Sequence, residues 1–482
     1  MPSSPTFFWH DYETFGRVPR RDRPAQFAGL RTDAQLNEIG APLMLYCQPP
    51  RDMLPDPESC LLTGILPQHC AEHGVAEHAF AARIEAALAE PGTIGVGYNT
   101  IRFDDEVTRH LFWRNLIDPY AREWQNDCGR WDLLDVVRCA YALRPEGIEW
   151  PRHDDGRVSF KLEHLSRANG LAHEAAHDAL SDVRATIALA RLIRDRQPKL
   201  FDFCLSLRRK DAVWQQIGAI AQNARPFLHI SGMYGAERGC IALVWPLAPH
   251  PTNKNELIVW DLAHDPMQLA GLDADAVRLR MFSRSEDLPE GVERLPIKTI
   301  HVNKSPVVIG NHRTLSEPQA ARWGLDFALG MRHAEIARRE AAGWAALWPA
   351  VFQRPAATGP VDVDEDLYGG FVAPNDRRTL DRLRTLTPDQ LAAKRPAFED
   401  HRLEELLFRY RARNHPPTLT DDEQQRWNEH CHARLHEGAN GFTTLAQYLD
   451  RIDQLSEAAD ERGQDLLGAL ADWAEQIAPE TA

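Results

Sequence analysis

Two carboxylates separated by one residue, Asp11 and Glu13, follow an apolar run near the N-terminus of the chain. The run at residues 7–9 (Phe-Phe-Trp) is typical of a buried strand. Because successive side chains of a strand point to opposite faces, Asp11 and Glu13 are predicted to project together. Carboxylates held close repel each other unless a cation lies between them, and their oxygens suit Mg²⁺ or Mn²⁺. Taken alone, the spacing also fits an exposed polar strand end.

Two further groups of polar side chains could complete such a site. Asp104 stands near the start of a helix predicted over residues 103–115. His177 and Asp182 lie five residues apart, and both can face one pocket if His177 precedes a helix that carries Asp182 one turn inside it. Each group also has a simpler explanation, because acids favour a first helical turn and a histidine before a helix often caps or packs it. Only the combination of these groups with Asp11 and Glu13 indicates a shared site.

Four carboxylates and one histidine are the side chains needed for two-metal hydrolysis of a phosphodiester. The ions of such sites lie about 3.5–4 Å apart and contact the attacking and the leaving oxygen. An imidazole can take the proton of the attacking water because its pKa lies near neutrality. This chemistry needs no serine or cysteine nucleophile.

The elements expected to position these side chains begin with three consecutive strands, which favour an antiparallel meander. After the opening strand, the other two are predicted over residues 26–31 and 42–47, and a further strand over residues 93–97. Helices are predicted over residues 77–89, 103–115, 130–143 and 161–169, followed by a long helix that ends near residue 194.

The rest of the chain changes character twice. Between residues 227 and 309, short β-prone segments bounded by proline, asparagine and aspartate indicate a small barrel. Residues 320–352 are predicted to be helical, and residues 353–360 resemble a linker. Beyond residue 361 the chain is predicted to be mostly helical, with a basic and aromatic helix over residues 402–413.

Composition sets limits on the class of protein. A chain of 482 residues suggests about two to four domains, and no apolar run is long enough to span a bilayer. Eight cysteines without regular spacing and the absence of an export signal favour a reducing cytoplasm. The net charge of −15 speaks against a nucleic-acid partner unless basic residues line one groove and metal ions neutralise the site. Two His/Cys groups, around Cys60 and Cys431, lack the paired spacing of a zinc site.

Eight stretches spread over nearly the whole chain form a specific pattern. They are HDYETFG at 10–16, DRPAQF at 22–27, the segment 97–109, RWDLLDV at 130–136, YALRPEG at 141–147, AHDA at 176–179, HVNK at 301–304 and LFRYRARN at 407–414. With these stretches the sequence resembles the DEDD superfamily of 3′→5′ exonucleases, in the subgroup whose fifth residue is histidine. It resembles the bacterial exonuclease I family more closely still.

The resemblance implies an α/β fold with three domains. A ribonuclease H-like nuclease domain with a mixed sheet is expected over residues 5–196, and an SH3-like β-barrel domain over residues 197–352. A C-terminal helical domain over residues 361–480 is expected to close over the other two and form a channel for one DNA strand. Such a channel would let an acidic protein bind DNA, because the favourable charge is local.

The resemblance also implies a role for each residue of the site. Asp11, Glu13 and Asp182 would hold the catalytic metal, and Asp11 would also touch a second metal held by Asp104. His177 would orient and deprotonate the attacking water. Two Mg²⁺ ions are expected in each active site, with Mn²⁺ able to substitute.

A larger set of side chains is expected to contact DNA. Lys161 stands where the family carries an arginine, so it keeps the charge and loses the bidentate fork. Phe203 stands where the family carries a tyrosine, which keeps stacking and loses the hydroxyl. The full set is Glu13, Arg109, Tyr120, Trp124, Arg138, Arg144, Phe160, Lys161, Phe203, Lys210, Asn303 and Lys304.

The expected activity is Mg²⁺-dependent 3′→5′ degradation of single-stranded DNA to nucleoside 5′-monophosphates, in DNA repair and recombination. By resemblance, single-stranded DNA-binding protein is an expected partner, and the protein is expected to be a cytoplasmic monomer with no membrane contact. One alternative is an RNA-directed, oligoribonuclease-like enzyme, against which the two extra domains count. Another is a nuclease fold that only binds other proteins, although all five site residues are intact.

Overall fold

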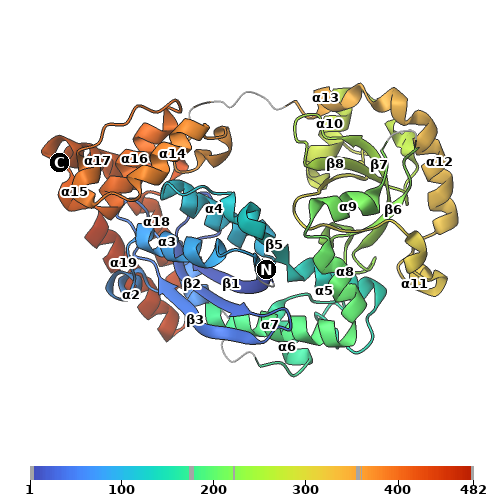
Figure 1. The fold of residues 1–482 in the computed structure, drawn as a ribbon, viewed down its shortest axis with the longest axis horizontal. Helices are drawn as coiled ribbons and strands as arrows, with labels where there is room; N and C mark the ends of the chain where they lie inside the picture. The colour runs from blue at the N-terminus through green and yellow to red at the C-terminus, as the bar shows by residue number, and fades with distance from the viewer. Residues whose placement is uncertain (1–4, 173–177, 221–222, 354–358, 360, 479–482) are drawn as a thin grey trace. The chain divides into compact units, whose positions relative to one another are not determined.

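The computed structural model describes residues 5–172, 178–220, 223–353, 359 and 361–478 (Figure 1). The chain divides into two compact units. The first unit comprises Met1–Gly129, Glu174–Arg184 and Thr358–Ala482. The second comprises Arg130–His173 and Ala185–Ala357. Among the described helices, none is both long and apolar enough to cross a membrane.

The first unit is built on a mixed sheet, in which four strands run in the order β3-β2-β1-β4. β1 pairs antiparallel with β2 and parallel with β4, and β2 pairs antiparallel with β3. The predicted meander is therefore confirmed. The strands are β1 (Thr6–Thr14), β2 (Pro24–Thr32), β3 (Glu38–Tyr46) and β4 (Thr93–Gly97).

Helices bury the apolar side chains of this sheet. Phe8 and Tyr12 of β1 pack in one cluster with Phe80 and Phe112, and Phe112 is fully buried. This packing holds α4 against the sheet, so that the acidic start of α4 lies beside β1. The helices of this part are α1 (Pro57–Thr63), α2 (Pro67–His73), α3 (Glu77–Leu88) and α4 (Asp104–Arg114).

The C-terminal helices belong to the same unit and share its cores. Trp113 and Leu116 pack with Leu380 and Leu407, and Phe15 packs in a second cluster with Leu467. The nuclease sheet and these helices therefore bury one another's apolar surface. The helices are α14 (Pro374–Leu383), α15 (Pro388–Ala392), α16 (Arg402–Asn414), α17 (Asp421–Leu435), α18 (Leu445–Ser456) and α19 (Glu461–Ile477).

A buried ion-pair network also joins these helices to the N-terminal part. Arg413 of α16 pairs with Asp52 and Asp364, and Arg434 of α17 pairs with the same two carboxylates at 2.6 and 3.0 Å. Burial alone would raise the pKa of Asp364, but Arg413, Arg409 and Arg434 outweigh it and hold that pKa well below its ordinary value. The basic side chains of α16 named here thus point inward to internal partners.

The second unit contains an antiparallel sheet in the order β10-β6-β7-β8-β9. β7 is buried along most of its length, which explains its continuous apolar sequence, and α12 (Phe327–Trp344) packs on it. All five strands lie within residues 227–309, the region that the sequence predicts to be β-prone. The strands are β6 (Phe227–Ile230), β7 (Ile241–Pro249), β8 (Glu256–Asp261), β9 (Ile297–His301) and β10 (Val307–Ile309).

One helix begins later than the sequence predicts. Residues 129–132 form the short strand β5 (Gly129–Asp132), so the helix expected from residue 130 is α5 (Leu133–Leu143). Asp132 explains the boundary, because its side chain accepts a hydrogen bond from the Leu134 amide and caps the helix. The other helices here are α6 (Leu162–Ala168), α8 (Pro198–Ser206), α9 (Lys210–Ile217), α10 (Ala274–Phe282), α11 (Glu317–Arg322) and α13 (Leu347–Val351).

Candidate active site

Three of the predicted metal ligands meet in the first unit. Asp11 and Glu13 project from β1, and Asp182 lies in the first turn of α7 (Ala179–Arg196). One carboxylate oxygen from each residue lies within 4.8 Å of the other two. The two-residue spacing on the strand and the first-turn position on the helix therefore bring together side chains that are far apart in the sequence.

Asp104 lies beside this cluster. It is the first residue of α4 and is only 4% exposed. Its Oδ1 accepts a hydrogen bond of 3.2 Å from the amide of Tyr12, the residue between Asp11 and Glu13. The Thr108 hydroxyl forms hydrogen bonds with the Asp104 carbonyl and with the Tyr12 hydroxyl, which ties the first turn of the helix to the strand. The fourth predicted carboxylate is thus held next to β1.

The electrostatics of the cluster are those of crowded, buried acids. Burial, followed by the charges of Asp104, Glu13 and Asp182, raises the pKa of Asp11 well above its ordinary value. Burial, followed by Asp182 and Asp104, raises the pKa of Glu13 to about 8. Such shifts arise when carboxylates lose solvent and face like charges, and a bound cation reverses both effects.

His177, the predicted base, lies outside the described residues. Its neighbour Asp178 is described and stands at the start of α7. The Asp178 carboxylate accepts a hydrogen bond from the Ser181 amide at 3.1 Å, and its backbone carbonyl accepts one from the Asp182 amide at 3.0 Å. The helix that carries Asp182 therefore begins at Ala179, two residues after His177 in the chain.

The residues of the first unit that are predicted to contact DNA differ in their exposure and in their partners. Trp124 is 64% exposed, whereas the Arg109 guanidinium is buried and pairs with Glu106 and Glu123. Arg109 also lies 5.3 Å from the centre of the Tyr120 ring, so this ring rests on a cation that already has carboxylate partners.

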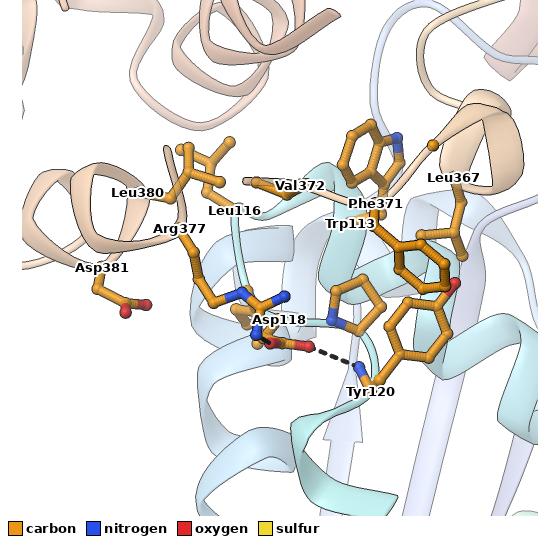
Figure 2. Close-up of a pocket in the computed structure, with 13 residues that line it drawn as sticks. Trp113, Leu116, Asp118, Tyr120, Leu367, Phe371, Val372, Arg377, Leu380 and Asp381 are labelled. Atoms are coloured by element: carbon orange, nitrogen blue, oxygen red, sulfur yellow. Dashed lines mark hydrogen bonds and ion pairs between the residues drawn. The ribbon is translucent and has the colours of Figure 1, made fainter. Parts of the chain in front are cut away.

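A pocket in the first unit adds an aromatic residue that the sequence reasoning missed. Tyr120 and Phe371 line it, with ring centres 6.3 Å apart (Figure 2). Phe371 is 88% exposed, which is unusual for a phenylalanine. Its position directly after Gly369-Gly370 was the available signal.

The remaining predicted contacts lie in the second unit. Arg144 and Phe203 line one pocket, and Lys161 is exposed at the start of α6. Phe160 packs against Tyr141 with ring centres 5.4 Å apart. The other members have partners within the protein: Arg138 pairs with Asp135, Lys210 donates to Asn255, the Asn303 carbonyl accepts from Arg130, and the Lys304 amide donates to the His301 carbonyl.

Comparison with protein families divides the chain into three matched segments. Residues 8–190 match the family described as Exonuclease. Residues 208–354 match the Exonuclease I SH3-like domain, and residues 361–477 match the Exonuclease I C-terminal domain. The exodeoxyribonuclease I of Escherichia coli (strain K12) is 46% identical over 475 residues, which cover 98% of each protein.

Solved structures give the same result. E. coli exonuclease I in complex with a dA16 oligonucleotide matches with a TM-score of 0.93 at 45% identity, covering 98% of this chain and 100% of that one. A moderately thermophilic exonuclease I from Methylocaldum szegediense matches with a TM-score of 0.93 at 47% identity and the same coverage. The predicted fold class, a mixed α/β nuclease domain followed by an SH3-like and a helical domain, is confirmed.

Proposed function

The chain belongs to the exonuclease I family, and on that basis we propose that it degrades single-stranded DNA from the 3′ end to nucleoside 5′-monophosphates with the help of Mg²⁺. The observation that carries the proposal is the meeting of Asp11, Glu13 and Asp182. The name of the E. coli relative and the oligonucleotide in its crystal structure support DNA as the substrate.

The carboxylate cluster fits divalent cations by its donor chemistry. Carboxylate oxygens are the ligands that Mg²⁺ and Mn²⁺ prefer, and the raised pKa values of Asp11 and Glu13 reflect negative charge that a cation would relieve. Asp11, Glu13 and Asp182 would hold one ion, and Asp104 with Asp11 the second. Two Mg²⁺ ions, or Mn²⁺ in their place, would supply Lewis acidity and neutralise charge on the phosphate.

The side chains of the chain itself would position the substrate and move the proton. His177 is proposed to accept the proton of the attacking water on a ring nitrogen, because imidazole titrates near neutrality. Glu13 is proposed to contact the terminal nucleotide as well as the metal. Lys161 would attract the phosphate backbone as a point charge, without the paired hydrogen bonds of an arginine.

Aromatic side chains are proposed to hold the bases. Trp124, Tyr120 and Phe371 offer ring faces on the first unit, and stacking contributes about 1–3 kcal/mol per base. A phosphate contact by Arg109 would require exchange with its carboxylate partners. Further contacts are assigned to the second unit: Arg138, Arg144, Phe160, Phe203, Lys210, Asn303 and Lys304.

The wider setting is also a proposal. We assign the nuclease domain to residues 5–196, the SH3-like domain to residues 197–352, and to residues 361–480 a helical domain that closes a channel for one strand. A channel supports selection of single strands and reconciles the net charge of −15 with DNA binding. The protein is proposed to act as a cytoplasmic monomer in DNA repair and recombination, in contact with single-stranded DNA-binding protein.

Substrate choice tests the proposal directly. Purified protein is incubated with Mg²⁺ and oligomers of one sequence, made as single-stranded DNA, duplex DNA and RNA. We expect rapid release of mononucleotides from single-stranded DNA only, and loss of that release in Asp11→Ala. Faster decay of RNA would identify an RNA-directed enzyme instead. Unchanged DNA degradation by Asp11→Ala would contradict the assignment of the metal site.

A further inference from the structure

We propose that Gln26 is a positioning residue for the metal site. Its side-chain amide holds the start of the helix that carries Asp182 against β2, the strand that pairs with the strand of Glu13. The inference deepens the proposed function and rests on it. Gln26 lies on β2 and is only 2% exposed. A buried amide of this kind requires hydrogen-bond partners, and those of Gln26 lie at the opening of α7.

Both ends of the Gln26 amide reach the N-terminus of α7. Its Oε1 accepts a hydrogen bond of 3.2 Å from the Ala179 amide, and its Nε2 donates to Asp178 Oδ1 at 3.4 Å. Nε2 also donates to the Tyr46 hydroxyl at 3.1 Å. The first amides of a helix have no partner within the helix, so a side chain that accepts from one of them sets where the helix begins.

Asp178 extends this contact into the helix. Its Oδ2 accepts from the Ser181 amide at 3.1 Å, and its backbone carbonyl accepts from the Asp182 amide at 3.0 Å. Gln26 thus bonds to Asp178, which caps the first turn of α7, and Asp182 lies in that same turn.

The other end of the contact is the metal strand. In the antiparallel pairing of β1 and β2, Gln26 is the direct partner of Glu13. Directly opposed residues of an antiparallel pair project from the same face. The Gln26 amide therefore lies between β1, which carries Asp11 and Glu13, and the first turn of α7, which carries Asp182. A shift of this turn would separate the oxygens that meet within 4.8 Å.

Three variants separate positioning from bulk packing. Gln26→Met keeps the length of the side chain and removes both kinds of hydrogen bond. Gln26→Glu keeps the acceptor for the Ala179 amide and places a carboxylate against Asp178. Gln26→Glu combined with Asp178→Asn reverses donor and acceptor, which restores the bond between positions 26 and 178 at unchanged net charge. Gln35→Met, at an exposed glutamine after β2, is the control.

The readouts are Mn²⁺ affinity by calorimetry, kcat and KM on single-stranded DNA, and the thermal unfolding midpoint. We expect Gln26→Met and Gln26→Glu to weaken Mn²⁺ binding and to lower kcat by about 10–100-fold each, as loss of outer-shell partners does at metal sites. KM is expected to stay within about twofold. The double variant should recover most of both losses, and Gln35→Met should behave as the wild type.

Two results would overturn the inference. One is wild-type Mn²⁺ affinity and kcat in Gln26→Met. The other is a double variant no better than Gln26→Glu, because the restored bond would then have no effect. Failure of the proposed function looks different, since the wild type itself would then release no nucleotides while Mn²⁺ calorimetry still reports on Gln26.

Discussion

At the scale of single residues, the carboxyl group of Glu13 makes the site sensitive to pH. Burial and neighbouring charges raise its pKa from 4.5 to about 8. Between these values the folded, metal-free protein holds a proton that the unfolded chain has lost, so this group makes the free energy of unfolding fall as pH rises. Asp11, whose pKa is raised by the same causes, acts in the same direction.

We therefore expect Glu13→Gln to lose less thermal stability than the wild type between pH 5 and pH 8 in EDTA, because the amide does not ionise. Melting curves across this range measure the difference. Glu38→Gln, at an exposed glutamate of β3, is the matched control and should follow the wild type. If Glu13→Gln and the wild type lost stability in parallel, the pKa of Glu13 would not be raised in the folded protein.

The predicted base has a separate test. His177→Ala should lower kcat by about 10²–10⁴-fold, the usual contribution of general-base catalysis, while binding of a hydrolysis-resistant oligonucleotide is kept. Single-turnover kinetics and fluorescence anisotropy measure the two effects. His153→Ala removes an exposed loop histidine and serves as the control. A loss confined to binding would show that His177 contacts DNA without moving the proton.

Sequence reasoning reached some residues of the site and not others, for a physical reason. The alternation of a strand and the first turn of a helix are local properties, and in combination they predicted that Asp11, Glu13 and Asp182 share one site. The partners of Gln26 at the start of α7 lie 152 and 153 residues further along the chain, and no local pattern reveals a hydrogen bond at that separation. Phe371 was missed because exposure depends on the whole fold.

At the scale of elements, α16 shows the same limit. The alternation of arginines and aromatic residues over 402–413 predicts a basic helix, but Arg409 and Arg413 turn inward to Asp362 and Asp364. Asp362 lies 47 residues before Arg409 and Asp364 lies 49 residues before Arg413, and only the fold brings these pairs together. The later start of α5 has a local cause instead, because the Asp132 side chain caps the helix at the Leu134 amide.

The ion pairs of α16 and α17 are expected to be essential for stability. Asp364→Asn leaves Arg413 and Arg434 buried with one fewer negative charge, and breaking a buried pair costs about 3–5 kcal/mol. Denaturant titration followed by circular dichroism measures the loss. Glu335→Gln breaks an exposed pair with Arg338 and should cost less than about 1 kcal/mol. Equal, small effects of the two changes would contradict a structural role for this network.

At the scale of the whole molecule, the first unit is assembled from both ends of the chain. Trp113 and Phe15, from the N-terminal part, are buried in clusters completed by side chains of the C-terminal helices. Residues 361–477 match a separate family domain, yet their apolar surface is shared with the sheet part of this unit. A family boundary here does not mark an independent core.

A fragment of residues 1–360 is therefore expected to aggregate or to bind hydrophobic dyes, because its half of each shared cluster would be exposed to water. Co-expression with a fragment of residues 361–482 should restore a soluble complex, and size-exclusion chromatography with dye binding distinguishes the two cases. A fragment 1–360 that is soluble and unfolds cooperatively by itself would contradict the shared cores.

The most direct test of the central claim, that Asp11, Glu13 and Asp182 hold the divalent cation that supports hydrolysis, is the rate of nucleotide release from single-stranded DNA as a function of Mg²⁺ concentration, for the wild type and Asp182→Asn. We expect no release in EDTA, saturable activation of the wild type by Mg²⁺, and a loss of about 10³-fold or more in Asp182→Asn even at saturating Mg²⁺. Release in EDTA at the full rate, or an Asp182→Asn protein that matches the wild type at high Mg²⁺, would contradict the account.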